Sequence, residues 1–70
     1  MYYAIEKTGA GSRIRFQIKK VYESGLVCPV TTSPETYKRY STEDAARAAA
    51  AAANIEIRKT GDFYAIIANG

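Results

Sequence analysis

The segment 41–54, STEDAARAAAAAAN, decides the fold of this chain, because it reads as one short helix built almost entirely of alanine. Ser41 is a favourable N-cap, and Asp44 stands three residues later, where a short acid can accept from the backbone N–H of the cap. Alanine has the highest helix propensity of any residue, and Asn54 tolerates the left-handed conformation in which helices often end. The sequence therefore predicts a helix over residues 41–54.

This helix must pack against another surface, since a helix of roughly twelve residues is not stable alone in water. Alanine side chains bury little area, but they let the helix backbone approach its partner closely. Glu43 and Arg47 are four residues apart and can pair on the solvent side. The stripe expected to face the partner surface consists of Ala45, Ala48, Ala49 and Ala52. The bulky core residues must then come from the surface beneath the helix.

Three segments before the helix alternate apolar and polar residues as strands do: 1–7 (MYYAIEK), 13–22 (RIRFQIKKVY) and 26–30 (LVCPV). Glycine-containing turns at 8–12 and 23–25 connect them. Ile14, Phe16 and Ile18 share one strand face, which we expect to meet the helix. Pro29 cannot donate a ladder hydrogen bond, so the third strand should lie at a sheet edge.

Two further strands are expected after the helix, at 55–60 (IEIRKT) and 63–68 (FYAIIA), joined by a Gly61-Asp62 hairpin turn. Ile55 and Ile57 then face the core, whereas Phe63 and Ile67 fall on the opposite face. The complete prediction is an α+β fold in one domain, residues 1–70. It consists of an antiparallel sheet of four to five strands with one alanine-rich helix packed on one face, in the order β-β-β-α-β-β.

Composition argues against most catalytic and metal chemistry. The chain has no histidine, and Cys28 is its single cysteine, so a nucleophile would lack its usual base and no internal disulfide can form. The seven acids are scattered, which disfavours zinc and calcium sites. We therefore expect a non-enzymatic protein with no catalytic residues, no metal, no cofactor and no small-molecule substrate. With no apolar run of 18 residues and no signal peptide, the sequence predicts a cytoplasmic protein that does not enter a membrane.

A basic row is predicted on the sheet face turned away from the helix. Arg13, Arg15 and Lys19 share that face with Gln17, and no acid occurs between Lys7 and Tyr22. Three interpretations are open: an ordinary solvated face, a surface for an acidic protein, or a nucleic-acid surface. The last uses cations for phosphates and tyrosines for bases. Tyr37 with Lys38 and Arg39 forms a second candidate contact patch.

Apolar residues on the same uncovered face predict a protein interface. Phe63 and Ile67 would be exposed there, in the company of Tyr2, and contiguous exposed apolar area usually marks a binding surface. We therefore expect a non-enzymatic binding module that associates with itself as a homodimer or with another protein, and alternatively with nucleic acid through the basic sheet face. The candidate partner-binding residues are Tyr2, Arg13, Arg15, Lys19, Phe63 and Ile67.

The order of elements and the length of 70 residues resemble small helix-on-sheet domains of bacteria and phages. The size is also similar to that of phage-encoded inhibitors such as anti-CRISPR proteins. This resemblance concerns format alone. It implies an accessory or inhibitor protein that acts by surface contact, and it assigns no role to any residue.

Overall fold

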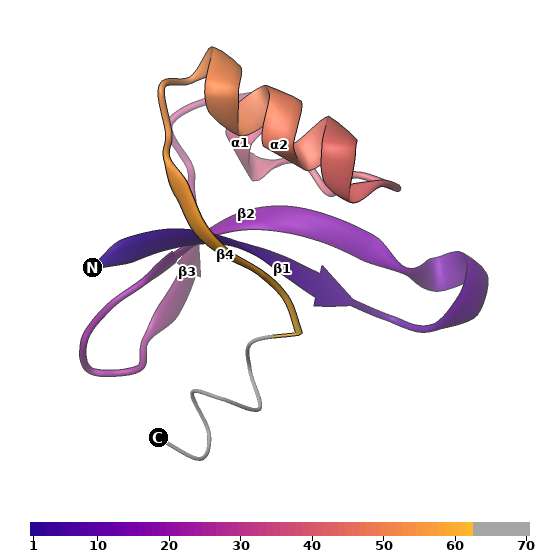
Figure 1. The fold of residues 1–70 in the computed structure, drawn as a ribbon, viewed down its shortest axis with the longest axis horizontal. Coiled ribbons are helices and arrows are strands. Elements are labelled where there is room, and N and C mark those ends of the chain that lie inside the picture. The colour runs from indigo at the N-terminus through magenta and orange to yellow at the C-terminus, as the bar shows by residue number, and fades with distance from the viewer. Residues whose placement is uncertain (63–70) are drawn as a thin grey trace.

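The computed structural model describes residues 1–62, and these form a four-stranded sheet with two helices on one of its faces (Figure 1). The predicted strand 63–68, with Phe63 and Ile67, lies outside the described residues. The fold class α+β is confirmed, but the order is β-β-β-α-α-β. The elements are β1 (Tyr2–Thr8), the 3-10 helix η1 (Gly11–Arg13), β2 (Arg15–Val21), β3 (Val27–Pro29), α1 (Pro34–Tyr37), α2 (Glu43–Ala52) and β4 (Ile57–Gly61).

The sheet is mixed, so the prediction of a wholly antiparallel sheet is wrong. Its strand order is β3-β2-β1-β4, with antiparallel pairing among the first three strands. β4 runs parallel to β1. The reason is the path of the chain. After the edge strand β3 the chain passes through the helical layer and reaches the far side of β1, and a connection of this kind returns a strand in parallel orientation. β3 lies at the sheet edge, as Pro29 predicted.

The short helix α1 was not predicted, because residues 31–40 read as a polar connection. Ser33 is its N-cap, and Ser33 and Thr36 form a capping box through their side chains and backbone N–H groups. Pro34 occupies the first turn, where its missing N–H costs nothing. The Thr36 hydroxyl also donates to the Val30 carbonyl at 3.2 Å, which ties α1 to the end of β3. The sequence Ser-Pro-Glu-Thr at 33–36 therefore contained the signal for a helix start.

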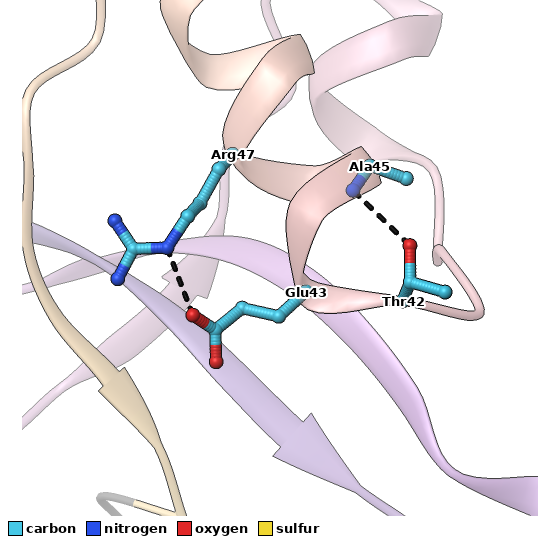
Figure 2. Close-up of polar contacts among 4 residues, drawn as sticks. All are labelled: Thr42, Glu43, Ala45 and Arg47. Carbon is cyan, nitrogen blue, oxygen red and sulfur yellow. Dashed lines mark hydrogen bonds and ion pairs between the residues drawn. The ribbon is translucent and has the colours of Figure 1, made fainter.

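Helix α2 begins one residue later than expected. Thr42, not Ser41, is the N-cap, and its Oγ1 accepts from the Ala45 N–H at 3.2 Å (Figure 2). The shift has a tertiary cause: Tyr40 is held in an isolated bridge to Phe16 of β2, so the chain is still extended just before Ser41. The predicted pair is confirmed, with Arg47 Nε donating to Glu43 Oε2 at 2.8 Å (Figure 2). Asn54 follows the helix with φ +58°, the left-handed conformation predicted for it.

The face of α2 that packs on the sheet differs from the predicted stripe. Ala46 and Ala50 are fully buried, whereas Ala48 and Ala52 are exposed. Ala50 packs with Ile18 and Val30, and the half-buried side chains around this cluster are Tyr3, Ala49, Ile55 and Ile57. Ile18, Ile55 and Ile57 belong to this cluster, as predicted, whereas Ile14, which was predicted on the same strand face as Ile18, precedes β2. Because nearly every residue of α2 is alanine, its sequence carries no periodicity that could select one face over another.

The opposite sheet face carries a second apolar cluster, in which Ala4 and Val21 are buried and Tyr2 and Val27 pack against them. Of these residues, Tyr2 was predicted to lie on that face. Neither helix within residues 1–62 is long and apolar enough to cross a membrane.

Candidate functional site

One end of the β1–β2 hairpin gathers three exposed cations. The register pairs Thr8 with Arg15 and Lys7 with Phe16, so Lys7 and Arg15 lie on neighbouring strands where the hairpin closes. Arg13 lies in η1, within the connection between the two strands. Lys7, Arg13 and Arg15 are all exposed. The hairpin therefore presents three positive charges at its tip.

A second segment adds two more cations to this end of the sheet. Phe16 and Tyr40 form an isolated antiparallel bridge with two backbone hydrogen bonds, each of 2.7 Å. This bridge places Tyr40 across β2 from Lys7, roughly 10 Å away at two strand spacings. Lys38 and Arg39 immediately precede Tyr40 and are exposed. We call the five cations together the basic end: Lys7, Arg13, Arg15, Lys38 and Arg39.

Among the residues that the structure describes, the charge of the basic end is not neutralised by ion pairs. Segment 63–70 contains no charged side chain, so all ten Lys and Arg residues and all seven acids lie within the described residues. The salt bridges formed among residues 1–62 are Lys19–Glu6 and Arg47–Glu43, and neither includes a member of the basic end. Within residues 1–62, the five cations of the basic end are therefore not held in ion pairs.

Aromatic rings lie among these cations. The Lys38 ammonium is 5.5 Å from the centroid of the Tyr40 ring, a cation–π distance. Phe16 and Tyr40 are half-buried, and the Tyr40 hydroxyl donates to the Glu35 carbonyl at 2.6 Å. Tyr37 has 53% of its surface exposed. The basic end thus combines positive charge with one freely accessible ring and one partly accessible ring.

Arg15 also has a structural role in the hairpin. One guanidinium nitrogen donates to the carbonyls of Ser12 and Ile14, at 3.2 Å and 2.7 Å. These bonds hold the connection that carries Arg13. Since a guanidinium has five N–H donors, Arg15 retains donors for a ligand.

The predicted basic row on the open sheet face is not continuous. Arg15, Gln17 and Lys19 do share a face, but Gln17 is buried and its amide nitrogen donates to the Tyr37 carbonyl. The Lys19 side chain is only 13% exposed and lies 3.6 Å from Glu6 Oε1. Tyr2 lies at the other end of β1, in contact with Arg58. Of the predicted contact residues, the structure therefore brings Arg13 and Arg15 together and separates Lys19 and Tyr2 from them.

Glu6 is a buried acid with one oxygen left without a partner. Its side chain is 2% exposed, and among residues 1–62 its Oε2 has no hydrogen-bond partner. Burial raises the pKa of Glu6 above its ordinary value of 4.5, although the Lys19 charge and hydrogen bond act in the opposite direction. The folded protein therefore holds the Glu6 proton to a higher pH than the unfolded chain does.

This raised pKa predicts that the stability of the protein decreases as the pH rises. The contribution of the Glu6 proton is fully present below 4.5 and is lost as the pH rises through the higher folded pKa. Glu6→Gln, which has no proton to lose, should remove this fall, whereas Glu56→Gln at an exposed acid should keep it. Urea unfolding at a series of pH values from 4 to 8 would measure both variants. An unchanged pH profile in Glu6→Gln would contradict this account of Glu6.

The other end of the sheet is apolar. Tyr2 pairs with Val21, which places Met1 next to Tyr22, and the Tyr22 N–H donates to the Leu26 carbonyl at 2.9 Å. Met1, Tyr22 and Leu26 are all exposed. These three side chains offer an exposed apolar area for the predicted homodimer. The homodimer itself stays a prediction, because Phe63 and Ile67, on which it was based, lie outside the described residues.

Residues 1–62 offer little to other kinds of site. No group of three or more His, Cys, Asp or Glu side chains there could hold a metal ion. Cys28 is half-buried in β3, opposite Lys20. A hollow of about 400 Å³ lies between the two helices, lined mainly by alanines of α2 and by the hydroxyls of Thr32, Ser33 and Thr36. These hydroxyls bond to one another and to the start of α1, so they are already engaged in holding that helix.

No protein-family model, no curated protein and no solved structure matches this chain. The functional interpretation therefore depends on the surfaces described above. Among them, the basic end is the largest gathering of exposed groups of one chemistry.

Proposed function

We propose that this protein is a non-enzymatic binding module and that its basic end binds single-stranded nucleic acid. The observation that supports the proposal most directly is the Phe16–Tyr40 bridge. It brings two cation-bearing segments, more than twenty residues apart in the chain, to the same end of the sheet, and among residues 1–62 none of these cations forms an ion pair. Phosphates attract such a surface, and displacement of their counterions supplies most of the affinity.

The rings favour nucleic acid over an acidic protein partner. Tyr37 is the most exposed aromatic residue among residues 1–62 and directly precedes Lys38 and Arg39. A cation and a flat ring in neighbouring positions suit a phosphate and its base, and stacking on an aromatic side chain contributes about 1–3 kcal/mol per base. Since bases in a duplex are already stacked, this arrangement favours a single strand. Such binding would suit an accessory or inhibitor protein that acts by occupying a strand.

Binding to a fluorescein-labelled oligonucleotide would test the proposal, with fluorescence anisotropy as the readout. The double substitution Lys38→Gln/Arg39→Gln should weaken the affinity for a 12-nucleotide strand about tenfold or more at low salt. It should also lower the slope of log affinity against log salt by about 0.7 for each phosphate that the variant no longer neutralises. Tyr37→Ala should weaken binding of a single strand more than binding of a duplex, because stacking needs an unpaired base.

The matched control is Arg47→Gln, which removes one positive charge from the exposed side of α2. Its affinity should stay within about twofold of the unmodified protein, since a single charge distant from the strand acts only through a screened field. The absence of any binding by single or double strands of DNA or RNA at low salt would refute the proposal. So would an equal loss of affinity in Arg47→Gln and in the double variant.

A further inference from the structure

A β-bulge in β4 places two consecutive cations on one face of the sheet. Tyr3 of β1 is opposite Ile57, but the next residue, Ala4, is opposite Lys59, so Arg58 is the extra residue. In a regular strand successive side chains point to opposite faces, and Arg58 and Lys59 would be separated by the sheet. Here Lys59 shares the face of its partner Ala4, and Arg58 lies over the ring of Tyr2 on that same face. Bulges often redirect side chains in this way at binding sites.

These side chains surround a small hollow. Tyr2, Arg58 and Lys59 line a volume of about 220 Å³ on the face opposite the two helices. Among residues 1–62, neither cation forms an ion pair. The centre of the Arg58 guanidinium lies 5.3 Å from the centroid of the Tyr2 ring. Because this cation–π contact restrains the guanidinium, its N–H donors are oriented before a ligand arrives.

We propose that Tyr2, Arg58 and Lys59 form a binding site for a phosphate group. Arg58 supplies a planar pair of donors that matches two phosphate oxygens, and Lys59 adds a point charge beside it. Tyr2 orients Arg58 and offers an apolar ring edge to the rest of the ligand that carries the phosphate. Lys59 is half-buried, so its ammonium is confined near the hollow.

This site is separate from the basic end. Tyr2 and Thr8 are the two ends of β1, so the hollow lies roughly 20 Å from the hairpin tip at the usual rise per strand residue. The phosphate has two possible sources: a free ion or mononucleotide, or the backbone of a strand that also contacts the basic end. Both present the same group to Arg58, and the experiment below distinguishes them.

The test is a titration of the full-length ¹⁵N-labelled protein at constant ionic strength, followed by amide chemical shifts. The probes are inorganic phosphate, adenosine 5′-monophosphate and a 12-nucleotide single strand, with sodium chloride as the reference. Saturable shifts centred on the Arg58 and Lys59 amides are expected with at least one phosphate probe. Saturation by either small probe identifies a free ligand, and saturation by the oligonucleotide alone identifies a strand phosphate.

Arg58→Gln should weaken that binding about tenfold or more, the usual effect of losing a charge-assisted hydrogen bond. Arg58→Lys should show an intermediate effect, because it keeps the charge but not the planar donors. Arg47→Gln has the same change in net charge as Arg58→Gln and should bind as the unmodified protein does. Absence of saturable shifts at the Arg58 and Lys59 amides with all three probes, or equal affinity in Arg58→Gln, would overturn the proposal. Neither result would bear on Lys38 and Arg39, which are tested separately above.

Discussion

Ala50→Leu is expected to destabilise the protein strongly. Ala50 is 0% exposed and packs against Ile18 and Val30. Close approach of the helix backbone to the sheet leaves no space for three additional carbon atoms. Overpacking of this kind typically costs about 1–3 kcal/mol. The core of so small a domain supplies only about 3–5 kcal/mol, so a large part of the population should be unfolded near physiological temperature.

Ala51→Leu is the matched control, because residue 51 is the next position of the same helix and is exposed. Leucine and alanine have similar helix propensities, so this variant should stay within about 0.5 kcal/mol of the unmodified protein. Thermal unfolding followed by circular dichroism measures both. We expect Ala50→Leu to lower the midpoint by about 10 °C or more, given the 4–8 °C per kcal/mol typical of this size. Equal midpoints for the two variants would show that α2 does not pack through Ala50.

Gly9→Ala is expected to have the second large effect. Gly9 has φ +86°, a conformation that residues with a side chain rarely adopt. A Cβ at this position would lie 2.3 Å from the Arg13 carbonyl oxygen and 2.9 Å from its carbon. Both atoms belong to the backbone and cannot rotate away. The substitution should therefore cost at least about 2 kcal/mol, combining the left-handed backbone penalty with a steric clash.

Gly11→Ala separates these two causes. Gly11 also has a positive φ, of +58°, but an added Cβ there would meet no atom within 4 Å. In this variant the free energy of unfolding should decrease only by the left-handed backbone penalty, about 1 kcal/mol. Urea unfolding of both proteins gives the difference, which measures the clash. Because Gly9 lies in the connection that carries Arg13, Gly9→Ala should also weaken oligonucleotide binding. Equal stability of the Gly9→Ala and Gly11→Ala proteins would refute this interpretation of the turn.

The basic end illustrates how far a candidate site can be predicted from sequence. Arg13 and Arg15 were recognisable as exposed cations of one hairpin, and Lys38 and Arg39 as a separate patch beside Tyr37. Their union depends on the bridge between Phe16 and Tyr40, a long-range pairing that no local pattern in either segment specifies. Lys19 does not join them because it forms an ion pair with a buried acid, Glu6, its diagonal neighbour on β1. The bulge that brings Arg58 and Lys59 to one face could not be predicted either, because the sequence of this strand alternates regularly.

By itself, the sequence determined the features that depend on neighbours along the chain. These are the extended segments of β1 to β4, the helical tract of alanines, the Glu43–Arg47 pair and the left-handed Asn54. Tertiary structure alone decided that β4 runs parallel to β1, that α2 packs through Ala46 and Ala50, and that five cations meet at one end. The physical reason is the range of the interactions. Helix propensity, capping and alternation act over a few residues, whereas strand pairing and the choice of a face on a uniform alanine helix arise only when distant segments come into contact.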